Sequence, residues 1–150
     1  MPSKTRLDLD RFVPYRLSVL TNTVSSAIAR HYSDRFGLSI PEWRVIAVLG
    51  QTSGLSARQV AQRTAMDKVQ VSRAVASLLA DRRLVREAHA SDGRIAHLSL
   101  SSKGRAIYDE VVPLALALEK KFLAVLTHKE RDAFDMLLSK LSASTAAISD

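Results

Sequence analysis

Two short capped segments, separated by only three residues, constrain the fold more than any other feature of the sequence. Each begins with an oxygen-bearing residue followed three places later by Gln, in Ser56-Ala-Arg-Gln59 and in Asp67-Lys-Val-Gln70. The oxygen accepts a hydrogen bond from the first turn of a helix, and the Gln can bond back to the cap amide. The pattern predicts helices over residues 57–64 and 68–82. Because residues 65–67 leave little slack, the two helices must pair at a tight angle, as in a helix-turn-helix.

The same capping pattern predicts two further helix starts. Ser39-Ile-Pro-Glu42 begins a helix over residues 40–51, and Thr127-His-Lys-Glu130 begins a last helix. The apolar positions of this last helix are Phe134, Leu137, Leu138, Leu141 and Ile148.

Two longer helices are predicted from apolar residues at three-to-four spacing. The first covers about residues 15–35 and ends near Gly37, with Pro14 in or just before its first turn. The second follows Ser101 and continues to Val125, and Pro113 predicts either a kink or a tight start in it.

Residues 84–100 break the helical pattern. Residues 84–89 and 95–100 flank Asp92-Gly93, a dipeptide typical of a tight β-hairpin turn. In the second run apolar and polar residues alternate, as in a half-buried strand. The expected fold is therefore mainly α-helical, with a two-stranded β ribbon directly after the helix over residues 68–82.

The helix over residues 68–82 has no acidic residue on the side opposite its apolar stripe. On a helical wheel the stripe holds Val71, Val75, Leu78 and Leu79, and the opposite side holds Val69, Gln70, Arg73, Ala76, Ser77 and Ala80. Small side chains let a helix approach the floor of the DNA major groove, where Arg can bond guanine, Gln can bond adenine and Val can contact a thymine methyl. The composition indicates a recognition helix. The alternative is a helix pair that serves only in packing.

Further residues are suited to contacts with a nucleic-acid backbone. Helix N-termini and the side chains near them bind phosphates, and this predicts phosphate contacts for Ser56, Arg58, Lys68 and Ser72. At the tip of the ribbon, Arg94 is expected to enter the adjacent minor groove, with Asp92 and Gly93 supporting the tip. An ordinary surface turn is the alternative for the tip.

The positive charge of the chain is concentrated in one third of its length. The 22 basic and 15 acidic residues give a net charge of +7, of which residues 58–105 contribute +6. Such a concentration points to a polyanionic partner. The basic residues of this segment are Arg58, Arg63, Lys68, Arg73, Arg82, Arg83, Arg86, Arg94, Lys103 and Arg105.

Several function classes are excluded by composition. The chain has no cysteine, which excludes disulfides, a thiolate nucleophile, thiolate metal sites and thiol-based redox sensing. The four histidines lie in different predicted elements without paired spacing, so no metal site and no cofactor are expected. No nucleophile elbow, phosphate loop or paired-carboxylate site is present, so an enzyme is not expected.

The sequence also gives an expectation about location. It has no apolar run near the ~20 residues needed to cross a bilayer, and its first ten residues contain no apolar signal-peptide core. The protein is expected to be soluble and cytoplasmic, with no membrane partner.

These residues together resemble the MarR-type winged helix-turn-helix transcriptional regulators. The resemblance rests on Val71-Ser72-Arg73, Leu84-Val85-Arg86, Asp92-Gly93-Arg94, and Leu100-Ser101 followed by Lys103-Gly104, and the box from Thr127 to Glu130 is similar to the start of the family's last helix. One departure is Arg83, which stands where the family usually places Gly.

The resemblance implies a homodimer. Residues 1–36 and 106–150 would form a helical dimerisation region, and residues 37–105 the winged helix-turn-helix DNA-binding region. Two winged domains would address a palindromic double-stranded DNA, with half-site centres about one helical turn apart. The expected function is a sequence-specific regulator, most often a repressor.

The family also commonly responds to a small organic anion, often phenolic. By this resemblance the ligand-binding candidates are Tyr15, Arg16, Trp43 and Arg44. The stretch Pro14-Tyr15-Arg16-Leu17-Ser18 is also similar to regulators of aromatic-acid breakdown that sense coenzyme A thioesters. The competing function is a non-specific architectural or RNA-binding winged-helix protein, which shares the charge but needs no discriminating face.

Overall fold

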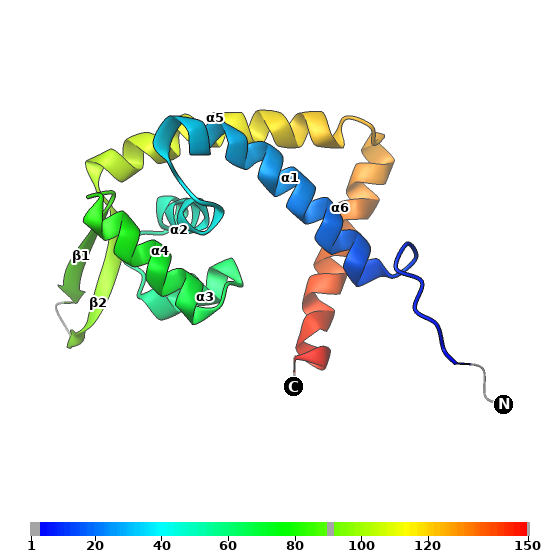
Figure 1. The fold of residues 1–150 in the computed structure, drawn as a ribbon, viewed down its shortest axis with the longest axis horizontal. Coiled ribbons are helices and arrows are strands. Elements are labelled where there is room, and N and C mark those ends of the chain that lie inside the picture. The colour runs from blue at the N-terminus through cyan, green and yellow to red at the C-terminus, as the bar shows by residue number, and fades with distance from the viewer. Residues whose placement is uncertain (1–3, 90–91, 150) are drawn as a thin grey trace. The chain divides into compact units, whose positions relative to one another are not determined.

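The structure is a computed structural model that describes residues 4–89 and 92–149, without the side chains of residues 89 and 92–94. Figure 1 shows its elements in chain order, and they divide into two compact units, Met1–Leu114 and Ala115–Asp150. The elements are α1 (Val13–Phe36), α2 (Ile40–Gln51), α3 (Ala57–Thr64), α4 (Lys68–Ala80), β1 (Leu84–His89), β2 (Asp92–Leu100), α5 (Ser102–Leu123), α6 (His128–Ser144) and the 3₁₀ helix η1 (Thr145–Ile148). The prediction of a mainly helical chain with one two-stranded antiparallel sheet is confirmed.

All four predicted N-caps form. Reciprocal capping boxes begin α2, α3 and α6, each with the cap side chain and the Glu or Gln three residues later bonded to each other's backbone amide. At the start of α4 only one half of the box forms, because Asp67 accepts from the Gln70 amide at 2.8 Å and no bond returns from the Gln70 side chain. The Gln70 side chain is thus left for other contacts.

The connection between α3 and α4 is the tight turn that the spacing predicts. Ala65, the residue after α3, adopts the left-handed conformation with φ 52°, and Met66 is buried in the core. The left-handed region is costly for a residue with a Cβ, so this turn stores a small strain at Ala65.

Helix α4 ends at Ala80, two residues before the predicted end. The chain reverses there because Arg82 has a φ of 57°, and the Arg83 amide then bonds back to the Leu78 carbonyl at 2.8 Å. This is the arrangement of a Schellman motif, which ends a helix through a left-handed residue.

The predicted hairpin forms, but the turn at Asp92-Gly93 is wrong. Both residues belong to β2, which begins three residues earlier than expected, and Asp92 pairs with His89. The pairing is irregular between Ala88 and His89. Ala88 pairs with Ala96 but His89 pairs with Asp92, so one step along β1 corresponds to four residues of β2. Such a bulge absorbs the extra residues, and the connection falls on residues 90–91, outside the described part.

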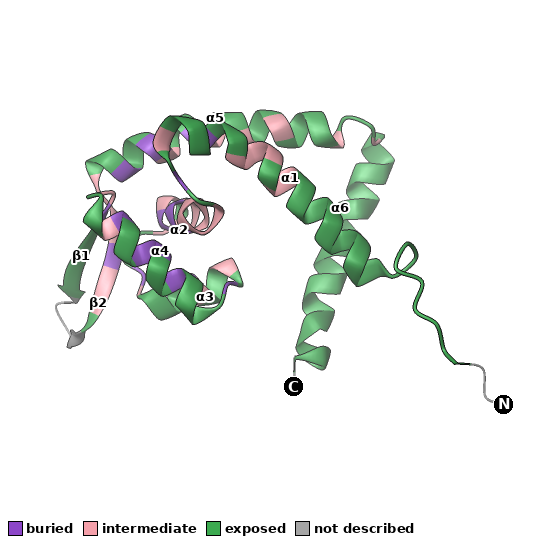
Figure 2. Cartoon of the chain, in the orientation of Figure 1, coloured by how far each residue is buried: buried purple, intermediate pink, exposed green. Residues whose placement is uncertain are grey.

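The core lies within the first unit (Figure 2). It joins the inner faces of α2, α3 and α4 to the base of the hairpin and to α5. Its most completely buried side chains are Tyr32, Leu38, Ile46, Leu49, Leu78, Leu98, Val45, Val60, Val71 and Val111. A bridge between Leu55 and Leu98 fixes the segment before α3 against β2.

Helix α5 begins at Ser102, and the residue before it caps the start. The Ser101 hydroxyl accepts from the Gly104 amide at 3.1 Å and donates to the Arg82 carbonyl at 2.6 Å. A Cβ on Gly104 would lie 2.1 Å from the Arg83 carbonyl oxygen, so only glycine fits. Pro113 lies inside α5, so of the two alternatives expected there, a kink or a tight start, the tight start is wrong.

The second unit contains the end of α5, α6 and η1. Neither α6 nor η1 buries a described side chain within the single chain. Across the described residues, no helix combines the length and apolarity required for a transmembrane span.

Candidate nucleic-acid interface

The six residues expected to face away from the core on α4 are all exposed. They are Val69, Gln70, Arg73, Ala76, Ser77 and Ala80, called the reading face below. The buried side of the helix holds Val71, Ala74, Val75 and Leu78, while Leu79 is half-buried. The side chain of Val69 is 58% exposed. An apolar side chain so exposed between Gln70 and Arg73 is suited to a partner's apolar group.

A first groove lies between α3 and α4 and has a volume of about 240 Å³. The α3–α4 groove is lined by Ala57, Arg58, Ala61, Lys68, Val71 and Ser72. It therefore brings together three of the four predicted phosphate contacts. The fourth, Ser56, caps α3 and accepts from the Gln59 amide at 3.2 Å.

A second groove, of about 280 Å³, lies between the start of α2 and α4. The α2–α4 groove is lined by Ser39, Pro41, Glu42, Gln70, Arg73, Ala74 and Ser77. The Ser77 hydroxyl donates to Glu42 Oε2 at 3.1 Å, and Glu42 Oε1 accepts from the Ser39 amide at 3.2 Å. The capping pattern placed Glu42 at the start of α2, but no sequence signal connected it with the reading face.

Four of the ten basic residues between 58 and 105 form side-chain hydrogen bonds with other residues of the chain. Three of them donate to carbonyls at helix C-terminal ends, where the helix dipole favours a cation. Arg83 Nη2 bonds the Phe36 carbonyl at the end of α1 (2.6 Å), Lys103 Nζ bonds the Asp81 carbonyl after α4 (3.0 Å), and Arg105 Nη1 bonds the Gly50 carbonyl in α2 (3.1 Å). The fourth, Arg63, donates to the Thr52 hydroxyl at 3.0 Å. These cations stabilise the fold.

The other described cations of the segment are exposed, and their side chains form no hydrogen bond or ion pair with any described residue. They are Arg58, Lys68, Arg73, Arg82 and Arg86. Because their heads are solvated and unpaired, they supply the charge that a polyanion would meet. The concentration of positive charge in the sequence therefore divides into cations that bond the fold and cations that are free for a partner.

The tip of the hairpin is described only by its backbone. Asp92, Gly93 and Arg94 lie in β2, and their side chains are outside the described residues. Leu84 and Leu98, at the base, are buried in the core. The hairpin is thus anchored at its base directly after α4.

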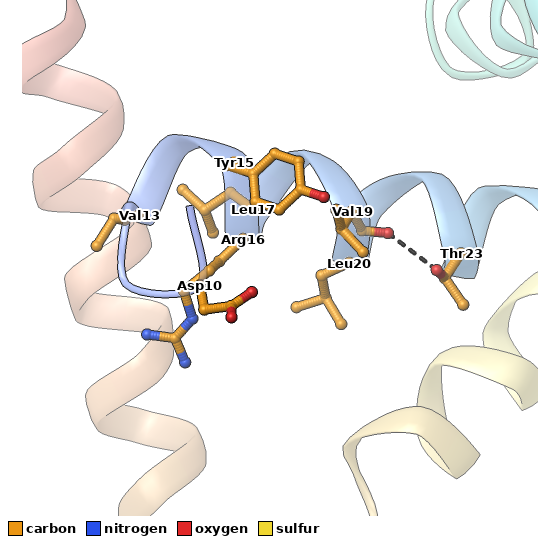
Figure 3. A pocket seen from close by; sticks show the side chains of 8 residues that line it. All are labelled: Asp10, Val13, Tyr15, Arg16, Leu17, Val19, Leu20 and Thr23. Carbon is orange, nitrogen blue, oxygen red and sulfur yellow. Dashed lines mark hydrogen bonds between the residues drawn. The ribbon is translucent and has the colours of Figure 1, made fainter. Parts of the chain in front are cut away.

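The four ligand candidates fall in two different places. Tyr15 and Arg16 line a groove of about 640 Å³ along the first half of α1, called the α1 groove, which Figure 3 shows. Its other lining residues are Asp10, Val13, Leu17, Val19, Leu20 and Thr23. Trp43 and Arg44 do not line this groove.

Trp43 instead packs between two tyrosines. Its ring centroid lies 5.6 Å from that of Tyr32 and 6.4 Å from that of Tyr108. Burial raises the pKa of the Tyr32 hydroxyl, and the nearby positive charge of Arg44 partly opposes that rise. This aromatic stack joins α1, α2 and α5 beside the core.

Comparisons with known proteins agree with this geometry. The model of the MarR family matches residues 36–95, from the end of α1 into β2. The chain is 27% identical over 133 residues to the HTH-type transcriptional repressor Rv2887 of Mycobacterium tuberculosis. The aligned residues cover 88% of this chain and 92% of that protein.

Solved structures extend the likeness to nearly the whole chain. A MarR/EmrR family transcriptional regulator from Acinetobacter sp. ADP1 has a TM-score of 0.85 at 27% identity, covering 94% of this chain and 99% of that one. BpsR of Bordetella bronchiseptica has the same fold, with a TM-score of 0.80 at 24% identity over 92% of this chain and 98% of its own. The prediction that the protein is not an enzyme is confirmed by this kinship. Residues 36–95 thus match the MarR family, and most of the chain is similar in sequence and fold to winged helix-turn-helix transcriptional regulators of that family.

Proposed function

We propose that the protein is a homodimeric, sequence-specific repressor that binds palindromic double-stranded DNA and is released by a small organic anion. The observation that carries the proposal is the reading face of α4, whose six residues are all exposed and none of them acidic. A cytoplasmic location follows from a chromosomal target.

Base recognition is assigned to the first half of α4. Arg73 has the guanidinium geometry for a bidentate bond to guanine, Gln70 the amide for adenine, and Val69 an apolar contact for a thymine methyl. Ala76, Ser77 and Ala80 keep the rest of the face small enough for close approach.

Phosphate contacts are assigned to the α3–α4 groove. Arg58, Lys68 and Ser72 line it, and the amide ends of α3 and α4 add partial positive charge. Ser56 is also assigned a phosphate contact, at the first turn of α3 that it caps. These contacts position the protein without reading sequence. For the wing, Arg94 is proposed to enter the minor groove, with Asp92 and Gly93 supporting the tip.

Dimerisation is proposed through the apolar surfaces that the single chain leaves open. On the first unit these include Val13 (52% exposed) and Val19 (47%), and on the second Met136 (53%) and Leu141 (51%). Large apolar side chains left exposed in this number are typical of an association site. A two-fold dimer presents two copies of α4, which is the reason to expect a palindromic target.

The effector is proposed to be an organic anion that contacts Tyr15 and Arg16 in the α1 groove, where a ring can pack on apolar side chains and a carboxylate can meet Arg16. BpsR offers a precedent in the same fold, since its DNA binding is regulated by 6-hydroxynicotinic acid. Trp43 and Arg44 stay candidates on the sequence resemblance alone. A coenzyme A thioester is a larger ligand that would supply negative charge through its phosphates.

The test is selection of bound sequences from a random duplex pool, followed by titration of the selected and a scrambled duplex at physiological salt. We expect a palindrome and an affinity ratio of about 10³ or more. A ratio near one contradicts sequence-specific binding and favours a non-specific architectural protein.

A further inference from the structure

Arg83 occupies the point where the recognition helix, the hairpin and α5 meet. Its amide bonds the Leu78 carbonyl at 2.8 Å, and its carbonyl accepts from the Ser101 amide at 3.1 Å. The same carbonyl lies against Gly104, where a Cβ would approach it to 2.1 Å. The backbone of Arg83 is therefore fixed to the end of α4, to the end of β2 and to the first turn of α5.

The side chain of Arg83 leaves this junction and reaches the first helix. Its Nη2 donates to the Phe36 carbonyl, the last of α1, at 2.6 Å. A charged donor on the carbonyl end of a helix forms a strong hydrogen bond that the helix dipole reinforces. The Nε of the same guanidinium is buried and has no partner among the described residues. A buried donor without a hydrogen-bond partner costs free energy.

Helix α1 is attached to the rest of the first unit mainly through its last turns. Residues 11–23 are all exposed in the single chain, and Tyr32 is the only buried residue among its 24 (Figure 2). Near its end, Arg35 forms an ion pair with Glu110 of α5, and Phe36 is half-buried against the core. A displacement of α1 would therefore move the Phe36 carbonyl, to which Arg83 is bonded.

We propose that Arg83 is a positioning residue for DNA binding, which ties the end of α1 to the base of the wing. The hydrogen bond to the Phe36 carbonyl makes the wing and the end of α4 follow the position of α1. Arg83 acts through this bond and does not contact DNA. The inference rests on the proposed DNA-binding function, but the link between α1 and the wing base can be measured without DNA.

The test compares Arg83→Met, which keeps the stem but removes the donors, with Arg83→Lys, which restores one donor. Arg82→Gln is the matched control, because it removes the same charge from the neighbouring exposed residue. Two quantities are measured for each: amide hydrogen exchange without DNA, and affinity for the selected duplex as a function of salt.

For Arg83→Met we expect faster exchange both at residues 33–38 and at residues 84–88. We also expect about five- to tenfold weaker DNA binding, typical of a lost coupling contact, with an unchanged salt slope. Arg83→Lys should recover part of both effects. Arg82→Gln should leave the exchange of both segments unchanged.

Two results would overturn the proposal. A salt slope lowered by about one in Arg83→Met, with unchanged exchange, would make Arg83 a phosphate contact. Faster exchange at the end of α1 alone, with unchanged affinity, would show that the bond does not position the wing. If Arg83→Met does not fold, Arg83→Lys decides, since its shorter reach should still loosen both segments together. Failure of the DNA-binding function itself would appear in the unsubstituted protein, as equal affinity for the selected and scrambled duplexes.

Discussion

Ser77, on the reading face of α4, donates its hydroxyl to Oε2 of Glu42 in the first turn of α2, at 3.1 Å. The other oxygen of that carboxylate accepts from the Ser39 amide. One side chain thus caps α2 and holds a residue of α4. It also places a negative charge in the α2–α4 groove, which Arg73 lines as well.

Glu42→Gln should strengthen binding to DNA of every sequence. The amide preserves the cap, because Gln serves in a capping box as Glu does, while the charge that repels phosphate is lost. The expected gain is about fivefold at most, the size of an exposed charge interaction. Titration of the selected and scrambled duplexes checks it. A gain for the selected duplex alone would instead indicate that Glu42 contributes to base preference.

Two exposed lysines should differ in their effect on the salt dependence of DNA binding. Lys68 lines the α3–α4 groove with a free ammonium, whereas Lys103 Nζ bonds the Asp81 carbonyl. Lys68→Ala should lower the slope of log affinity against log salt by about one. Lys103→Ala should leave the slope unchanged and reduce thermal stability. Equal slopes for the two variants would refute the division of the basic residues into fold-bonding and free cations.

Ala65→Gly should stabilise the protein. Ala65 has a φ of 52° in the turn before α4, and glycine adopts this conformation without the Cβ penalty. The expected increase in the free energy of unfolding is about 1 kcal/mol. Ala106→Gly, in the interior of α5, is the matched control and should destabilise by about 0.5–1 kcal/mol. Urea unfolding measures both, and destabilisation by Ala65→Gly would disagree with the described turn.

Glu130 should titrate below its ordinary pKa of 4.5, because its carboxylate accepts from the Thr127 amide at 3.0 Å. A lowered folded pKa means that the cap contributes fully above the ordinary value and is lost as the pH falls through the lowered one. The carbon-13 shift of the Glu130 carboxyl against pH measures this. Thr127→Ala should move the pKa back toward 4.5. A titration at or above 4.5 in the unsubstituted protein would contradict the capping box.

Local chemistry made the helices predictable. Capping depends on residues three apart, so Ser39, Ser56, Asp67 and Thr127 marked helix starts that the structure confirms. The residues of the reading face could also be predicted from the sequence, because a 3.6-residue period assigns each position of α4 to one side of the helix.

Features that depend on contacts across the fold were not predictable. The bond between Arg83 and Phe36 joins residues 47 apart in sequence, and that between Ser77 and Glu42 joins residues 35 apart. Counting charges along the chain could not tell Lys103 from Lys68, because the difference is a carbonyl supplied by another helix. The start of β2 was misplaced for a similar reason, since the pairing of Asp92 with His89 decides it and not the turn preference of Asp-Gly.

The most direct test of base reading by α4 is the affinity ratio between selected and scrambled duplexes in Arg73→Lys. Lysine keeps the charge but lacks the planar fork that bonds two guanine acceptors. We predict a loss of about 1–3 kcal/mol on the selected duplex, a relaxed preference at one base pair in each half-site, and unchanged affinity for the scrambled duplex. An unchanged ratio with an unchanged selected sequence would contradict the assignment of α4 as the helix that reads DNA.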